Sequence, residues 1–215
     1  GTVVAKGRGS GFLDEPQKLD EFFERIFEKT TVQISVKTRV GKDSPAIFEE
    51  LLDIFNKYPI KELIVHPRIQ KDFYKNTPRM DCFETAVEKS RNPLCYNGDL
   101  FTAQDYENFH KAFPTIEYVM LGRGVIANPG LLGEIKSGQK ISRERLREFH
   151  DRLYCDYRTL FGDDRNALFK MKEVWSYLAG LFEDSSGYAK KIKKSGNHMQ
   201  YKTAVDALFQ DCRLR

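Results

Sequence analysis

The chain has 215 residues, of which 40% are hydrophobic, 13% aromatic and 31% charged, and its mean hydropathy is −0.54. This composition supplies a core and excludes intrinsic disorder, while no apolar run reaches the ~18 residues that cross a membrane. The net charge of +4 is uneven, because residues 140–215 hold 16 Lys and Arg against 11 Asp and Glu, which suggests an anionic partner for the C-terminal third.

Residues 1–139 show a repeated strand-then-helix pattern. Runs rich in β-branched and apolar residues predict strands at 31–40, 61–68, 92–99 and 116–124. Amphipathic segments predict helices at 16–30, 44–59, 81–91 and 102–114, with Ser44 and Thr102 as N-caps. Short strands that alternate with helices indicate βαβ units and a parallel sheet. Four units make either a small open sheet or half of a (β/α)8 barrel, which needs eight.

After residue 139 the pattern becomes helical. Segments 141–162, 166–182 and 201–212 carry apolar residues at helical spacing, and 184–197 is either a connection or a short basic helix. We therefore expect an α/β region at 1–139 and an all-α domain at 140–215.

Each predicted strand ends in polar residues or glycines at its carboxyl end, where parallel α/β folds bind ligands. Taken singly, each has an ordinary explanation as a solvated surface cation, a structural histidine, a turn or a helix-entry loop. Their presence at the carboxyl ends of all four predicted strands favours a site for an anionic, phosphorylated ligand. They are Lys37, Arg39, His66, Arg68, Asn97, Gly98, Asp99, Gly122, Arg123 and Gly124.

Flavin mononucleotide (FMN) suits this set better than a dinucleotide, because no G-x-G-x-x-G follows a strand. The stretch KGRGSG at 6–11 has no strand before it and is interpreted as a loop. Backbone N–H groups at Gly98 and Gly122 can hold a phosphate, to which Arg123 adds a charged contact. Lys37 can stabilise the negative charge of a reduced flavin ring, and His66 can donate a hydrogen bond to a carbonyl of that ring.

The motifs resemble those of the tRNA-dihydrouridine synthase family. They are, in order, VQISVKTRVG, ELIVHPR with a following Tyr74, NPLCYNGDL and EYVMLGRGVIANPGLL. The opening VVAKGRGSGFLDEPQKL and the later FKMKEVWSYLAGLF are also similar to family segments, whereas Pro67 stands where the family usually has Gly.

In that family an N-x-G-C-P loop with the cysteine acid precedes the segment that opens this chain, so the resemblance places the family cysteine just before Gly1. None of the four cysteines, at 82, 95, 155 and 212, matches that position, and we expect no catalytic residue in this chain and no activity from it alone. Their wide spacing, without a Cys-x-x-Cys pair, argues against a disulfide scaffold or a metal site and for the cytoplasm.

The resemblance implies an FMN-dependent oxidoreductase that reduces the C5–C6 bond of uridines in tRNA, with NADPH as electron donor. Residues 1–139 would be the C-terminal half of a TIM barrel and 140–215 a helical tRNA-binding domain, with no membrane partner. The implied FMN contacts are Lys37, His66, Asn97, Gly98, Asp99, Gly122 and Arg123. The implied uracil or tRNA contacts are Arg39, Arg68, Lys190, Lys191, Lys193 and Lys194.

Two alternatives stay open. One is another FMN barrel oxidoreductase that acts on a small molecule, such as a dihydroorotate- or dihydropyrimidine-dehydrogenase-like enzyme. A basic helical tail is unnecessary for such an enzyme. The other is a non-catalytic RNA-binding fragment. The lysine cluster at 190–194 could also be only a solvated helix face.

Overall fold

The computed structural model describes residue 4 and residues 6–215. Gly1, which the expected cysteine loop would precede, lies outside the described residues, as do Val3 and Ala5 of the family-like opening segment. The chain divides into two compact units. One contains the chain up to Asp99 together with 110–121, and the other contains 100–109 and 122–215. No helix within the described part is long and apolar enough to span a bilayer.

The first unit is built on a parallel sheet, which confirms the predicted α/β class. Its strands are adjacent in chain order, and Lys37, Ile64, Cys95 and Tyr118 form one row across them. Each strand is shorter than predicted at both ends, because residues on either side of it leave the ladder. They are β1 (Ser35–Arg39), β2 (Glu62–His66), β3 (Leu94–Tyr96) and β4 (Tyr118–Val119).

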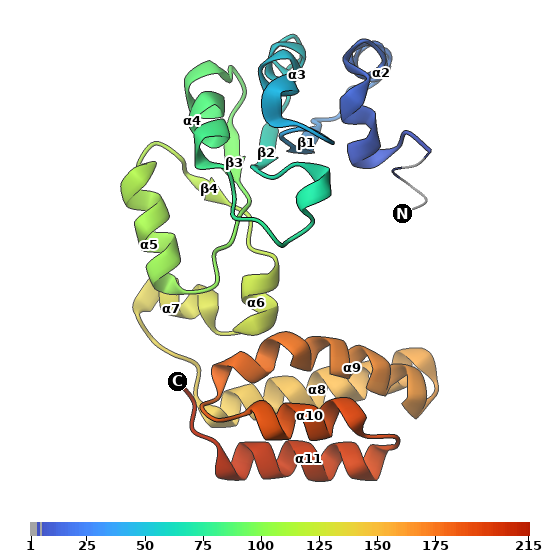
Figure 1. The fold of residues 1–215 in the computed structure, drawn as a ribbon, viewed down its shortest axis with the longest axis vertical. Helices are drawn as coiled ribbons and strands as arrows, with labels where there is room; N and C mark the ends of the chain where they lie inside the picture. Colours follow the sequence, from blue (N-terminus) through green and yellow to red (C-terminus); the bar gives the residue numbers. More distant parts are fainter. Residues whose placement is uncertain (1–3, 5) are drawn as a thin grey trace. The chain divides into compact units, whose positions relative to one another are not determined.

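Helices cover one face of this sheet (Figure 1). Leu63 and Val65 of β2 are fully buried on the covered face, and Phe83 of α4 meets Tyr96 of β3 edge-on with ring centroids 4.9 Å apart. Side chains alternate along a strand, so Lys37 and Tyr118 point from the opposite face and are exposed. The helices are η1 (Gly9–Asp14), α2 (Pro16–Lys29), η2 (Pro45–Ile47), α3 (Phe48–Phe55), η3 (Gln70–Asp72) and α4 (Met80–Lys89).

Both predicted N-caps are confirmed. Ser44 Oγ accepts the Ala46 N–H at 3.2 Å and begins the 3-10 turn that leads into α3. Thr102 Oγ1 accepts the Asp105 N–H at 3.0 Å, and the Asp105 carboxylate accepts the Thr102 N–H at 2.9 Å. This reciprocal capping box sets the start of α5 (Ala103–Ala112).

The second unit is helical, as predicted for the C-terminal third, and α8 to α11 run side by side in it (Figure 1). Its core gathers Leu146, Met171, Trp175, Tyr201 and Leu208, all 2% exposed or less. Residues 184–197 contain a basic helix. The helices are α6 (Arg123–Ala127), α7 (Leu131–Ser137), α8 (Arg143–Phe161), α9 (Asp164–Leu178), η4 (Ala179–Leu181), α10 (Ser186–Lys194) and α11 (His198–Asp211).

The second unit begins earlier than the predicted 139/140 boundary. Short α6 packs against α9, so the chain from Gly122 onward joins the helical unit. The sequence analysis did not predict α6 and α7, because each is shorter than two full turns plus caps and Pro129 separates them. The functional roles of the two regions remain predictions.

Candidate functional site at the strand ends

Cationic side chains line the uncovered face of the sheet at the carboxyl ends of β1 and β2. Lys37 and Arg39 are two residues apart and share that face, and Arg39 is in register with His66. The pKa of Lys37 is lowered, first because neighbouring protein displaces water and second because Arg39 is near. Arg39 Nη1 donates to the Ile69 carbonyl at 2.9 Å, and its guanidinium lies 6.0 Å from the Tyr74 ring centroid.

His66 is held neutral at this face. Its side chain is buried, and burial, followed by the charges of Arg39 and Lys37, lowers its pKa to about 3. Its Nε2 lies 3.3 Å from Nη1 of Arg68. A guanidinium only donates, so Nε2 accepts and we assign the ring proton to Nδ1. His66 therefore offers a neutral N–H donor.

Arg68 is a buried cation with defined partners. Its side chain is 1% exposed, and its guanidinium donates to both Asp99 carboxylate oxygens, at 3.0 and 2.5 Å. Its Nε donates to the Asn76 carbonyl at 2.5 Å. This fork-to-fork geometry fixes the Asp99 carboxylate. Arg68 thus positions Asp99 in this structure, and its predicted contact with uracil or tRNA stays a prediction.

The loop after β2 is anchored by a buried carboxylate. Asp72 is 4% exposed, forms an ion pair with Arg79, and accepts hydrogen bonds from the Asn76 amide at 2.5 Å and the Ile69 N–H at 3.0 Å. These contacts, chiefly the one with Arg79, lower the pKa of Asp72 to about 2. Contacts between residues of the loop itself therefore hold it in one conformation.

Phe73 follows Asp72 with φ 48° and ψ −101°. Glycine is the residue that adopts such backbone angles freely, and a bulky residue there costs about 1–3 kcal/mol. Phe73 and Tyr74 are 56% and 58% exposed. This feature could not be predicted from the sequence, because no local signal marks a phenylalanine with a positive φ.

Asn97 and Gly98 close the end of β3. The Asn97 N–H donates to the Val65 carbonyl at 2.9 Å, and its side-chain amide donates to the Met120 carbonyl at 2.7 Å. Asn97 therefore ties three strand ends together. A Cβ at Gly98 would lie 1.9 Å from the Tyr96 hydroxyl, so only glycine fits.

Gly122 and Arg123 belong to the second unit. A Cβ on Gly124 would lie 2.1 Å from the Leu100 carbonyl, so packing requires glycine there. A Cβ on Gly122 would enter open space, so packing does not explain Gly122, and its backbone is open to the close approach of a ligand. The Arg123 guanidinium lies 5.3 Å from the ring centroid of Phe101.

The cysteines lie outside this face or are buried within the sheet. Cys95 is 3% exposed in β3, and burial raises its pKa to about 11. Burial also raises the pKa of Cys82, on α4, to about 11. All four thiols are free. In the described part of the chain, His, Cys, Asp and Glu side chains form no cluster of three or more that could hold a metal ion.

The expected place of the family cysteine, just before Gly1, adjoins residues that the structure does not describe. The expectation that the catalytic cysteine lies there, and that this chain alone is inactive, therefore stays a prediction.

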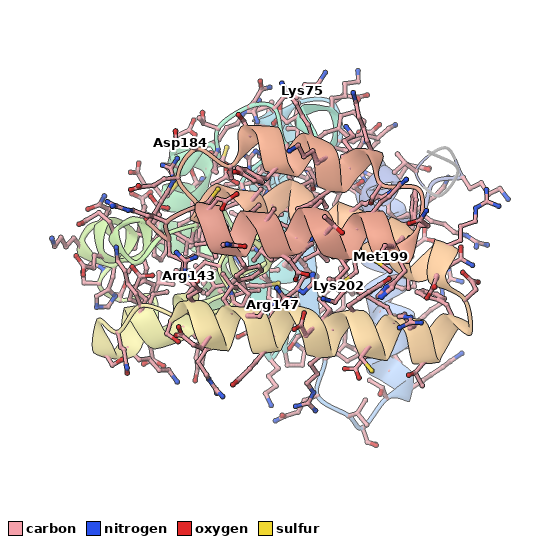
Figure 2. All side chains as sticks on the ribbon, turned by 90° about the horizontal axis from the view of Figure 1, so that it is seen from below. Lys75, Arg143, Arg147, Asp184, Met199 and Lys202 are labelled. Atoms are coloured by element: carbon pink, nitrogen blue, oxygen red, sulfur yellow. The ribbon has the colours of Figure 1, made fainter. Side chains whose placement is uncertain are left out.

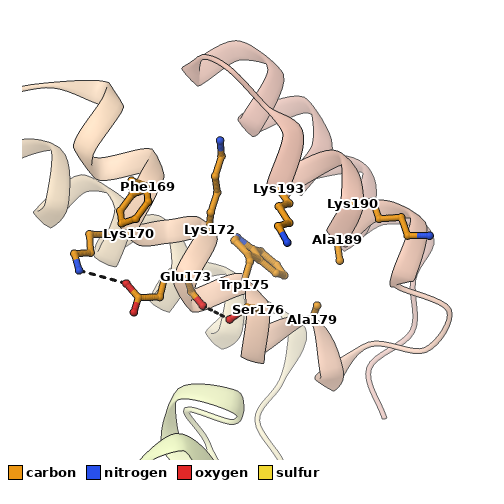
Figure 3. Close-up of a pocket in the computed structure, with 10 residues that line it drawn as sticks. All are labelled: Phe169, Lys170, Lys172, Glu173, Trp175, Ser176, Ala179, Ala189, Lys190 and Lys193. Atoms are coloured by element: carbon orange, nitrogen blue, oxygen red, sulfur yellow. Dashed lines mark hydrogen bonds and ion pairs between the residues drawn. The ribbon is translucent and has the colours of Figure 1, made fainter. Parts of the chain in front are cut away.

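A second candidate region lies between α9 and α10. A cavity of about 900 Å³ is lined by Phe169, Lys172 and Trp175 of α9 and by Lys190 and Lys193 of α10. Lys193 points toward the Trp175 indole on the cavity floor (Figure 3). Neither α10 lysine forms an ion pair with any described residue, and Phe169 is 68% exposed. An aromatic ring beside unpaired cations suits a nucleic acid.

Several other cations of the helical unit are neutralised by carboxylates. Arg147 and Lys202 lie between α8 and α11 (Figure 2), and both pair with Asp206, at 2.7 and 2.9 Å. Arg147 also pairs with Asp151 at 2.8 Å. The two α10 lysines that line the cavity, in contrast, keep their charge available for a partner.

Comparison with known proteins relates nearly the whole chain, and so both candidate regions, to one protein family. The family model described as Dihydrouridine synthase (Dus) matches residues 1–211. A probable tRNA-dihydrouridine synthase of Rickettsia conorii is 25% identical over 192 residues, which cover 83% of this chain and 56% of the relative. The tRNA-dihydrouridine synthase B of Pasteurella multocida is 25% identical over 137 residues, 63% of this chain and 41% of the relative.

A tRNA-dihydrouridine(16) synthase of Pseudomonas putida is 26% identical over 154 residues, which cover 70% of this chain and 47% of the relative. The chain thus spans about half the length of the curated relatives it matches. Because the family model covers nearly all of the sequence, the chain belongs to the dihydrouridine synthase family.

Proposed function

We propose that this chain serves in an FMN-dependent tRNA-dihydrouridine synthase that reduces the C5–C6 double bond of uridines in tRNA, with NADPH as electron donor. The observation that carries the proposal is the family match over residues 1–211. All four cysteines are free thiols, so the reducing cytoplasm is the compartment we propose.

The parallel sheet, with its strands adjacent in chain order, supports a further proposal, that it is the C-terminal half of a (β/α)8 barrel. The exposed Lys37 and the neutral His66 would then face the barrel interior. Both lie on the sheet face that the helices of the first unit leave uncovered.

The strand-end residues fit FMN. Bound FMN supplies hydride-transfer chemistry. The Lys37 ammonium would stabilise negative charge on a reduced ring, and the His66 Nδ1–H would donate to a ring carbonyl. Asp99, fixed by Arg68, adds an oriented acceptor. Gly122 and Arg123 would hold the phosphate through backbone N–H groups and a guanidinium. Asn97 and Gly98 would contact the flavin at the end of β3.

Two cationic regions would hold the tRNA. Arg39 would meet the uracil or a neighbouring phosphate at the strand ends. The α10 lysines would contact the phosphate backbone, which fixes orientation without reading sequence. They are Lys190, Lys191, Lys193 and Lys194.

An absorbance spectrum and a nucleoside analysis test the proposal together. The full-length enzyme that contains this chain should show, once purified, the absorbance of bound oxidised flavin, and its tRNA product should contain dihydrouridine by mass spectrometry. A protein that stays colourless with added FMN and leaves uridines unreduced would contradict it. A protein that binds flavin and reduces a free pyrimidine, but does not reduce tRNA, would favour the alternative of a small-molecule oxidoreductase.

A further inference from the structure

The exposed aromatic pair Phe73 and Tyr74 is not used by the proposed function. The two rings are 56% and 58% exposed in the loop that follows the carboxyl end of β2. A loop tip ordinarily carries small or polar residues, so two adjacent exposed rings at a strand end require an explanation.

The backbone presents Phe73 outward at an energetic cost. Its φ of 48° and ψ of −101° belong to conformations that favour glycine. Burial of the ring cannot offset this cost, because most of the ring is in solvent. Residues held in such conformations cluster at functional sites, where the surrounding structure fixes them.

The surrounding structure does fix this loop. The preceding residue is the buried Asp72, which is bound to Arg79 and Asn76. The Gln70 N–H donates to the Gly41 carbonyl at 3.0 Å, and the Lys75 N–H donates to the Asp72 carbonyl at 2.9 Å. The position of Phe73 is thus set on both sides, which gives a rigid rather than an adaptable aromatic surface.

The pair adjoins the cationic face of the candidate site. The Tyr74 ring lies 6.0 Å from the Arg39 guanidinium, and its centroid is 6.3 Å from that of His66, with the planes 28° apart. The aromatic surface therefore continues from His66, which we assign to the flavin ring, and from Arg39, which we assign to the uracil or a neighbouring phosphate. Cations beside exposed rings fit an anionic polymer of planar bases better than an apolar protein segment.

We propose that Phe73 stacks on the RNA base beside the target uridine and occupies the place that the uridine leaves when it is extruded. Extrusion costs stacking free energy, and a rigid ring at the gap recovers part of it for the neighbouring base. Tyr74 would line the path between this base and the strand-end site. The inference rests on the proposed function and adds a positioning residue to it.

The test uses the flavin-loaded full-length enzyme that contains this chain and a tRNA transcript in which mass spectrometry has located the reduced uridine. 2-Aminopurine replaces each neighbour of that uridine in turn, because its fluorescence falls when a ring stacks on it. We expect Phe73→Ala to weaken transcript binding about 5- to 140-fold and to abolish the quenching. Phe73→Trp should keep both. Phe22→Ala, which removes a similarly exposed ring (46%) from α2, is the matched control and should change neither.

Phe73→Gly separates recognition from folding. Glycine accepts φ 48° without strain, so this variant should melt at a higher temperature than the wild type while it binds the transcript as weakly as Phe73→Ala. A purely structural Phe73 would instead lose stability in both variants.

Each failure has its own meaning. Unchanged binding and quenching in Phe73→Ala, beside a wild type that makes dihydrouridine, would overturn the stacking role and leave the proposed function intact. The same holds if Phe73→Trp binds as weakly as Phe73→Ala. A wild type that neither binds the transcript nor reduces it would overturn the proposed function, and with it this inference.

Discussion

At the strand ends, the protonation state of His66 follows from its surroundings. An unfolded histidine binds a proton near pH 6.5, whereas burial and the charges of Arg39 and Lys37 lower the native pKa of His66 to about 3. Between these values the unfolded chain holds more protons, so His66 makes the free energy of unfolding fall as the pH drops from 6.5 toward 3.

We therefore expect the His66 ring resonances to show no titration between pH 8 and 5 in an NMR experiment. His66→Asn should reduce the loss of stability between pH 7 and 5, measured by urea unfolding at each pH. A ring titration with a midpoint near 6.5 would contradict the assigned neutral state.

The buried pair of Arg68 and Asp99 should be a principal source of stability at the site. Asp99→Ala leaves a guanidinium that is 1% exposed without its bidentate partner, so we expect a loss of about 2–3 kcal/mol in the free energy of unfolding. Asp43→Ala is the control, because Asp43 pairs at 3.0 Å with an exposed Lys71 and should cost less than about 1 kcal/mol. Equal losses of stability in the two variants would show that the buried pair of Arg68 and Asp99 contributes no more than an exposed ion pair.

At the scale of elements, α10 divides its lysines into two faces. Ile192 is 1% exposed and faces the core, while Lys190 and Lys193 line the cavity beside α9. Lys191 lies 5.5 Å from the Tyr188 ring centroid and does not line that cavity. Lys194, which helical spacing places between Lys190 and Lys191, does not line that cavity either.

If the cavity holds RNA, Lys190→Ala with Lys193→Ala should weaken tRNA binding and flatten its salt dependence by about 0.7–0.9 per lost phosphate contact. Lys191→Ala with Lys194→Ala should have a smaller effect. Flavin affinity should not change in either variant. The control is Lys89→Ala with Lys202→Ala, since both lysines already pair with carboxylates and neither lines the cavity. Equal salt slopes in the wild type and the Lys190/Lys193 variant would make α10 an ordinary solvated face.

The strands and long helices could be predicted from the sequence because their patterns are local. The run around Ser35–Arg39 and the helical spacing of Arg143–Phe161 are visible in ten to twenty residues. The Arg123–Ala127 and Leu131–Ser137 helices were missed because neither is long enough to show a period. Their stability comes from packing within the helical unit.

The candidate site could be predicted only in outline. The sequence places Lys37, His66 and Asn97 in or just after strands, near their carboxyl ends, and the structure has them there. Their part in a site stays a prediction. The pairing of Arg68 with Asp99 joins residues 31 apart, and no local pattern encodes it. The backbone of Phe73 is set by the Asp72 anchor, which is likewise a tertiary contact.

At the scale of the whole molecule, each compact unit has its own polar network. In the helical unit the Tyr201 hydroxyl, 1% exposed, accepts the Trp175 Nε1–H at 2.9 Å and lies 2.7 Å from Nε2 of His150. His150 Nδ1 lies 2.8 Å from Asp151, so Nδ1 donates to that carboxylate and Nε2 accepts from the tyrosine. All four residues belong to the second unit, whereas His66, Arg68, Asn76 and Asp99 belong to the first.

Separate networks predict separate responses to mutation. Tyr201→Phe leaves the Trp175 and His150 nitrogens buried without their partner, which should cost about 1–3 kcal/mol. We expect hydrogen exchange, followed by mass spectrometry, to rise in peptides of α8, α9 and α11 and to stay unchanged in β1 to β3. Asp99→Ala should produce the reverse pattern. Tyr177→Phe, at a ring that is 36% exposed and whose hydroxyl bonds to no described residue, should produce neither. Faster exchange throughout the chain in Tyr201→Phe would mean instead that the two units unfold as one cooperative structure.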